Sequence, residues 1–213
     1  MSKCINFMKI TDLLFNASED SKSSVTKEYI MNRLKLIGTA QLKFIAFNSG
    51  EEMTIKYHNE IDKLISTGVL DNKGVNNKIQ CDKGCSACCH SEVTITDLEA
   101  QVLRSFCKKN NLDLNTELMQ KQVGKYGEDW FGLDWESRKC MFLNDQGACS
   151  VYEARPGVCR KHLVISDPVK CGVRGALQVK DRIFNLEMEL LVSAMWQIRK
   201  IGNIAEMINS VED

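Results

Sequence analysis

The sequence predicts a mostly α-helical protein whose helices pack around a cysteine-rich segment that contains a short β-hairpin. Three observations favour this fold class: apolar residues recur at helical spacing in several segments, proline occurs only twice, and most of the ten cysteines fall in one central stretch. The 213 residues, 44% of them hydrophobic, suffice for a buried core. We expect three parts: an N-terminal helical segment (1–75), a cysteine-cluster domain (76–175) and a C-terminal helix packing on it (176–213).

Two helices are predicted before the cysteines. Residues 24–47 carry apolar side chains near helical spacing, and Ser24 is placed to cap this helix. Residues 49–68 open with the capping-box pattern Ser-Gly-Glu-Glu and end at Gly68. We expect the two helices to form a hairpin. Residues 68–80 are rich in Gly and Asn and have no periodicity, which is typical of a linker.

Three further helices are predicted after the first cysteines. Thr96 and Glu99 form a second capping-box pattern, and Cys107 continues the apolar stripe of the helix that follows, so we interpret it as core. A short helix is expected over 115–123, before two glycines. The segment 176–201 is apolar on almost every side, which indicates a helix buried on several sides.

Residues 140–152 predict the β-hairpin, because two short apolar runs flank an Asn-Asp-Gln-Gly turn. With a four-residue loop, Phe142 would lie opposite Cys149. Cys140 and Cys149 would then be diagonal neighbours on the same face of the ribbon. The hairpin is therefore expected to present both thiols together.

The overall composition excludes several classes of function. Lys and Arg total 28 and Asp and Glu total 28, so no broad basic field exists for general nucleic-acid or anionic lipid binding. No apolar run is long enough to span a membrane, and the N-terminus lacks the apolar stretch of a signal peptide. We therefore expect a cytoplasmic protein without a membrane partner. In that reducing compartment, metal binding is a better explanation of the cysteines than disulfides.

Eight of the ten cysteines form two groups. The first group is Cys81, Cys85, Cys88 and Cys89, and the second is Cys140, Cys149, Cys159 and Cys171. The two-residue spacer between Cys85 and Cys88 lets a turn direct two thiolates at one metal. Neighbouring side chains such as Cys88 and Cys89 diverge, so they serve two metals more easily than one. This pattern favours a polynuclear cluster or two nearby sites over a lone zinc, unless one of the pair is core.

Several thiolates around a metal leave a net negative charge, so cations are expected nearby. Six basic residues lie within four positions of a candidate ligand, although a solvated surface would also explain each: Lys83, Lys139, Arg155, Arg160, Lys161 and Arg174. His90 and His162 follow Cys89 and Cys159 closely, and either imidazole could complete a site. We assign no role to His58, which lies far from the cysteines in the sequence.

Two other cysteine chemistries share part of this spacing. Cys81, Cys85 and Cys88 match the radical-SAM spacing, but only about 120 residues follow, with few of the strand signals that such enzymes need. Cys85 and Cys88 also match a thioredoxin-like redox pair, yet no βαβ pattern surrounds them. Both readings are weaker than a metal site built from all eight cysteines.

Three stretches, CDKGCSACC, TITDLEA and CMFLNDQGACSVYEARPGVCRKH, resemble the YkgJ-like cysteine-cluster family over about residues 79–171. That family is a zinc- or iron-chelating domain with a CxxCxxCC core. The resemblance implies that all eight clustered cysteines are ligands, and it matches other signature positions at Tyr152, Arg155, Pro156 and Arg160. One departure is the stretch 161–163, where many members have an aromatic residue and proline. The family is also similar to flagellin lysine N-methylases, which are longer and carry a comparable cluster.

The leading hypothesis is a metal-binding protein that holds an iron-sulfur cluster (4Fe-4S) or Zn²⁺ through these cysteines. The N-terminal hairpin and the C-terminal helix should pack over the site, and mutual repulsion of the thiolates should disorder the central segment without metal. One alternative is an iron-sulfur enzyme for redox or methyl-transfer chemistry. Another is a zinc-stapled interaction module that exposes Trp130, Phe131 and Trp135, although core packing is the favoured role of these aromatics. No particular protein partner is predicted.

Overall fold

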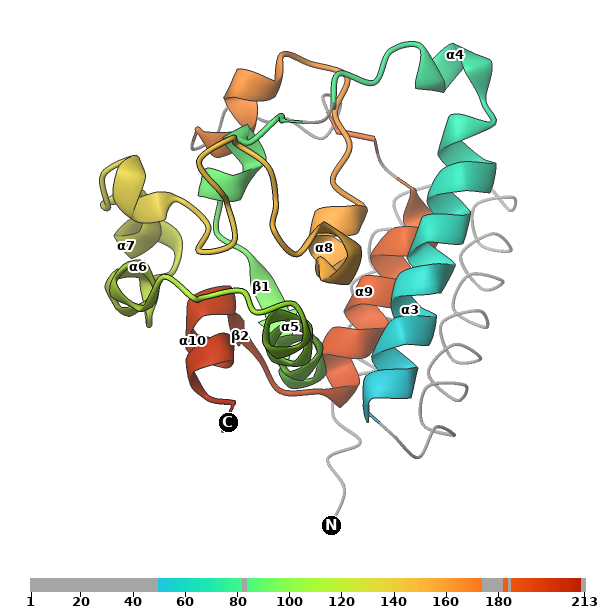
Figure 1. Ribbon diagram of the computed structural model, residues 1–213. Coiled ribbons are helices and arrows are strands. Elements are labelled where there is room, and N and C mark those ends of the chain that lie inside the picture. Colours follow the sequence, from blue (N-terminus) through green and yellow to red (C-terminus); the bar gives the residue numbers. More distant parts are fainter. Residues whose placement is uncertain (1–49, 82–83, 174–181, 184, 212–213) are drawn as a thin grey trace, which may run out of the picture. The chain divides into compact units, whose positions relative to one another are not determined.

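The computed structural model describes residues 50–211, except 82–83, 174–181 and 184. These residues belong to one compact unit, which spans 47–213. The helix predicted over 24–47, and with it the predicted helical hairpin, lies outside the described residues. The described part is mostly helical, as the sequence predicts, and the loops and short turns of the cysteine-rich segment lie beside its longer helices (Figure 1). Within it, no helix combines the length and apolarity needed to cross a membrane.

Helix α3 (Gly50–Ile65) confirms the helix predicted over 49–68. Glu51 and Glu52 occupy its first turn, where the positive end of the helix dipole favours carboxylates. One face of α3, which includes Tyr57 and Ile61, is buried. The chain continues through a π-helical turn (Ser66–Leu70) and the one-turn helix α4 (Lys73–Asn76), so the predicted linker is partly helical.

Helix α5 (Asp97–Lys109) begins with the predicted capping box. The Glu99 amide donates to Thr96 Oγ1 at 3.2 Å, and the Thr96 amide donates to Glu99 Oε2 at 2.9 Å. Cys107 is 4% exposed and packs in the main hydrophobic core, as predicted. Helix α6 (Thr116–Gln122) confirms the helix expected over 115–123, and the side chain of Asn115 caps it.

A two-stranded antiparallel sheet joins the cysteine-rich segment to the C-terminus. Strand β1 (Thr94–Thr96) pairs with β2 (Ile201–Asn203), with Ile95 opposite Gly202. Helix α10 (Ile204–Asn209) follows and packs on α5 and α6. Because each strand has three residues, neither gives the alternating pattern from which a strand is predicted, and the sequence did not indicate this sheet.

Helix α9 (Leu186–Ile198) is buried on several sides, as the apolar segment 176–201 predicts. It packs on α3 and β1, and Figure 1 shows α3 and α9 side by side. The predicted helix began too early, because residues 182–183 are extended. Arg182 forms an antiparallel bridge with Val164, and the Ile183 amide donates to the Leu163 carbonyl at 2.8 Å.

The predicted hairpin over 140–152 is a tight turn with a single bridge, Leu143 to Cys149, and its predicted register was wrong by one residue. Ser150, rather than Cys149, bonds to Phe142, with the Ser150 amide donating to the Phe142 carbonyl at 2.8 Å. The cause is the Asn144 side chain, whose Oδ1 accepts from two amides of the loop, at 3.0 and 2.9 Å, and shortens it.

The remaining chain consists of short helical turns. They are η2 (Ala87–His90), α7 (Gly127–Phe131), η3 (Glu136–Arg138), η4 (Tyr152–Ala154), α8 (Gly157–Arg160) and η5 (Pro168–Gly172). Two of these, α7 and η3, lie in the stretch 127–138. Four of the clustered cysteines lie on η2, α8 and η5.

Candidate metal centre

The first cysteine group is built around the turn η2. Cys88 and Cys89 lie on it, and the Cys89 amide donates to the Ser86 carbonyl at 2.9 Å. Gly84 precedes the turn with φ +88°, a conformation that favours glycine and that brings the chain round toward η2. Cys81 comes before Gly84 in the chain, and its Sγ accepts a hydrogen bond from the Val164 amide at 3.3 Å.

The second group meets the first at η2. The Cys140 amide donates to the Cys89 carbonyl at 2.7 Å, and Ser91 Oγ donates to the Cys171 carbonyl at 2.6 Å. The turn η5 packs directly on η2. A Cβ atom at Gly172 would lie 2.7 Å from the Ala87 carbonyl oxygen, so this approach requires glycine. The two groups, far apart in the sequence, therefore lie together.

The clustered cysteines are free thiols, Cys171 buried and the other seven partly buried, with no disulfide among the nine cysteines that the structure describes. Burial raises the pKa of Cys140 to about 12 and that of Cys171 to about 12. Burial also raises the pKa of Cys159 well above its usual range. Cys88 is the opposite case, because the Cys89 thiol donates a hydrogen bond to its sulfur and lowers its pKa. Cys88 is therefore the thiol best prepared to be a thiolate.

Mutual electrostatic effects divide the other thiols into two sets around Cys88. The pKa of Cys171 is raised by burial and then by three nearby thiols, Cys88, Cys81 and Cys85. The pKa of Cys159 is raised by burial and then by a different group, Cys140, Cys88 and Cys149. Cys88 acts on both sets, so its sulfur lies within electrostatic range of each.

Backbone amides reach two of the sulfurs in the second set. Burial raises the pKa of Cys140, and a hydrogen bond from the Phe142 amide opposes that shift. In the same way burial raises the pKa of Cys149 and the Val151 amide opposes it. Each amide lies two residues after its cysteine. Such N–H donors stabilise the negative charge of a metal-bound thiolate.

Arg155 is a cation placed beside the thiols, as the sequence predicts. Its charge favours the thiolate forms of Cys81, Cys88 and Cys149 and so opposes the effect of burial on the pKa of these groups. The guanidinium lies over the Tyr152 ring, 4.0 Å from its centroid. Its Nε is buried and has no hydrogen-bond partner. The Arg155 Nε–H group could therefore donate a hydrogen bond to a cysteine sulfur that becomes a thiolate.

The other predicted cations have different surroundings. Arg160 pairs with Asp62, and Lys161 Nζ lies 2.6 Å from Glu189 Oε2, so both charges are matched by carboxylates. Lys139 lowers the pKa of His90 as a minor effect beside burial. Lys83 and Arg174 lie outside the described residues.

The two histidines near the cysteines differ in their surroundings. The His90 ring stacks on Trp135, with centroids 4.0 Å apart, and its Nδ1 lies 3.2 Å from the Ser86 carbonyl oxygen. Trp130 Nε1 donates to the His90 carbonyl at 3.1 Å, and Trp130 is buried, as core packing predicts. His90 is therefore held as a packed side chain. Core packing was the wrong prediction for Trp135, which is 39% exposed, and Phe131 is partly buried. His162 has a buried Nε2 without a hydrogen-bond partner, and burial lowers the pKa of its imidazole.

The donor set fits zinc or iron in its chemistry, because soft thiolates are the preferred ligands of Zn²⁺ and of iron-sulfur clusters. Within the described ranges, however, no three His, Cys, Asp or Glu side chains are already arranged to hold a metal ion. The backbone thus brings the cysteines together, while side-chain rotations are needed to turn the sulfurs toward a common centre.

The sequence did not indicate that His58 is buried near the centre, in contact with Glu99. His58 is 4% exposed, and its Nε2 lies 3.3 Å from Glu99 Oε1. Glu99 in turn accepts a hydrogen bond from the amide of Gly157, two residues before Cys159. The available signal was the position of His58 beside Tyr57 on the apolar stripe of α3, which indicates a buried rather than a surface histidine.

Comparison with known proteins gave a match to a family model. A search of curated proteins and a search of solved structures each gave no match. Residues 80–178 match the family model CxxCxxCC, described as a putative zinc- or iron-chelating domain. The matched range covers somewhat less than half of the chain and contains all eight clustered cysteines. Residues 80–178 are therefore similar to the CxxCxxCC family, whose description is metal chelation.

Proposed function

We propose that the eight clustered cysteines bind zinc or iron as thiolates in two neighbouring sub-sites that share the turn η2. The observation that carries this proposal is the meeting of free, partly or fully buried thiols from both groups at η2. Sub-site 1 takes its thiols from Cys81, Cys85 and Cys171, and sub-site 2 takes its thiols from Cys140, Cys149 and Cys159. Cys88 and Cys89 lie between the two sub-sites and complete them.

The number of thiols supports two sub-sites or a polynuclear cluster. A tetrahedral zinc is saturated by four thiolates, and a 4Fe-4S cluster also takes four. Eight thiols are twice that number. Cys88 and Cys89 are adjacent in the chain, so their side chains reach two centres more easily than one. The electrostatic grouping of the other thiols on either side of Cys88 favours the same division.

The surrounding residues provide charge stabilisation and protection. The Arg155 guanidinium and the amides of Phe142 and Val151 face sulfurs that gain negative charge on metal binding. The burial of Cys140 and Cys159 limits access of oxidants to the thiols. When bound, zinc would crosslink the loops, whereas an iron-sulfur cluster would add electron transfer.

Metal and sulfide analysis of full-length protein purified without oxygen distinguishes the two forms of the proposal. Iron with labile sulfide and a brown absorbance at about 400 nm would identify a cluster. A colourless protein with about two zinc ions per chain would identify the two zinc sub-sites. Protein that holds neither metal after reconstitution would contradict metal binding.

Single substitutions test the ligand assignment. Cys171→Ala removes a thiol from sub-site 1, and Cys149→Ala removes one from sub-site 2, so each should lose about one of two zinc equivalents. Cys107→Ala is the matched control, because Cys107 is a buried free cysteine outside the cluster. Equal metal content in all three variants would show that these cysteines are not ligands.

A further inference from the structure

Helix α8, which carries Cys159, depends on its neighbours for its position. It is a single turn, and a single helical turn has little stability of its own. Its first residue, Gly157, packs directly on helix α3. A Cβ atom there would overlap the Tyr57 side chain and lie 2.8 Å from Ile61 Cδ1. The close contact with α3 therefore sets where α8 begins.

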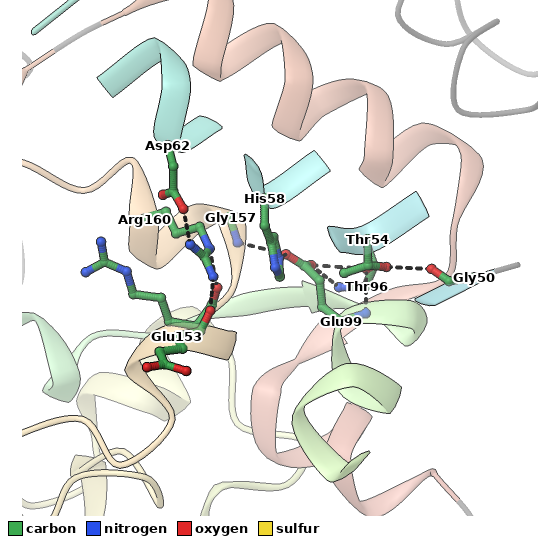
Figure 2. A network of polar contacts seen from close by, with 10 residues as sticks. Gly50, Thr54, His58, Asp62, Thr96, Glu99, Glu153, Gly157 and Arg160 are labelled. Carbon is green, nitrogen blue, oxygen red and sulfur yellow. Dashed lines mark hydrogen bonds and ion pairs between the residues drawn. The ribbon is translucent and has the colours of Figure 1, made fainter. Parts of the chain in front are cut away.

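A buried carboxylate of helix α5 links the first residue of α8 to His58 on α3. Glu99 Oε1 accepts a hydrogen bond from the Gly157 amide at 2.8 Å, which satisfies one of the unpaired amides at the start of the helix. His58 Nε2, on α3, lies 3.3 Å from the same oxygen. Glu99 is 2% exposed, and its other oxygen accepts from the Thr96 amide. Figure 2 shows both contacts of Glu99, with His58 and with Gly157.

A guanidinium fixes the last residue of α8 to α3. Arg160 is 7% exposed, and its Nη1 pairs with Asp62 of α3. Its Nη2 donates to the Glu153 carbonyl, and its Nε donates to the Arg155 carbonyl at 2.8 Å. Figure 2 shows the guanidinium between Asp62 and Glu153. Cys159 lies between Gly157 and Arg160, so both ends of its turn are held by α3.

We infer that His58 and Asp62 are positioning residues that hold the Cys159 thiol in the metal centre, acting through Glu99 and Arg160. The inference rests on the proposed function, since it assumes that Cys159 is a ligand. Helix α3 precedes the matched range 80–178, so the metal centre depends on a helix outside the family domain. Loss of such an outer contact typically weakens metal binding by about 10- to 100-fold.

Site-resolved alkylation of the zinc-loaded, full-length protein tests this inference. Asp62→Asn removes the charge that pairs with Arg160, at a side chain that is 45% exposed, so the variant should fold. We expect iodoacetamide to modify Cys159 about 10- to 100-fold faster in this variant, with Cys171 still protected. Glu60→Gln is the matched control, because Glu60 lies on the exposed face of the same helix. Mass spectrometry of the peptides gives the rate at each cysteine.

The possible outcomes separate the inference from the proposed function. Wild-type protein whose cysteines are not protected by zinc would refute both. Protected wild type together with a protected Cys159 in Asp62→Asn would refute the positioning role alone. Equal exposure of all eight thiols in the variant would also refute it, because α3 would then support only the fold. Restored protection in Asp62→Glu, and selective exposure of Cys159 in His58→Ala, are the results that the inference requires.

Discussion

Metal binding by these thiols should release protons, and the structure sets how many. Six of the eight clustered cysteines have a raised pKa. Burial is the main cause for Cys81, Cys140, Cys149, Cys159 and Cys171, whereas for Cys89 the main cause is its hydrogen bond to Cys88. At pH 7 these six are neutral thiols, and each must lose its proton to bind metal as a thiolate. Full loading of the two zinc ions should therefore release at least about six protons, to which the protons carried by Cys85 and Cys88 at pH 7 are added.

The sign of the pH dependence follows from the same count. Protons compete with the metal, so affinity falls as pH falls and rises as pH rises, up to the raised pKa values. The overall binding constant should change by about six powers of ten per pH unit near neutrality. Cys88 contributes less than the others, because the hydrogen bond from Cys89 lowers its pKa.

Calorimetric titration with zinc, in two buffers of different ionisation enthalpy at pH 7, measures the number of protons released. Cys107→Ala serves as the control and should release the same number, because Cys107 lies in the hydrophobic core. Zinc binding at two equivalents with fewer than about two protons released would refute the reasoning, since buried neutral thiols could not then be the ligands.

Three further perturbations follow from the packing and the charges. Trp130→Ala should destabilise the protein by about 3–5 kcal/mol in chemical denaturation, because it empties a buried site and removes the hydrogen bond to His90. Gly172→Ala should lower stability by about 1–3 kcal/mol and weaken metal binding, since its Cβ would collide with Trp135 and the Ala87 carbonyl. Metal-free protein should lose stability as pH rises above about 8.5, because thiols with a raised folded-state pKa then bind more protons folded than unfolded. An unchanged melting temperature between pH 8 and pH 10 would contradict that last expectation.

Local chemistry explains what could be predicted from the sequence. The capping box of Thr96 and Glu99 requires only residues three positions apart, and the structure contains both of its hydrogen bonds. Cys107 follows the apolar stripe of the same helix, which identified it as core. The convergence of the two cysteine groups was predicted in the same way, from cysteine spacing and from the Arg-Pro-Gly turn before Cys159.

Features that depend on distant partners could not be predicted in this way. The β1–β2 sheet pairs strands of three residues that are more than one hundred positions apart, so neither strand carries a pattern of its own. The register at Cys149 depends on how the Asn144 side chain closes the loop, which several turn types would allow. His58 and Asp62 are ordinary polar residues in sequence, and their contacts with Glu99 and Arg160 exist only once α3 packs on α8.

Burial changes the expected state of the metal-free protein. From the sequence, unmetallated thiolates should repel one another and disorder the central segment. In the folded protein, however, Cys140 and Cys171 have pKa values of about 12, so near neutral pH they are neutral and repel little. Two other features do not require metal either: the hydrogen bond and ion pair that hold α8 in place, and the hydrophobic core around α5. Metal should therefore add crosslinks to thiols that are already gathered, and the deprotonation that it demands opposes part of its binding energy.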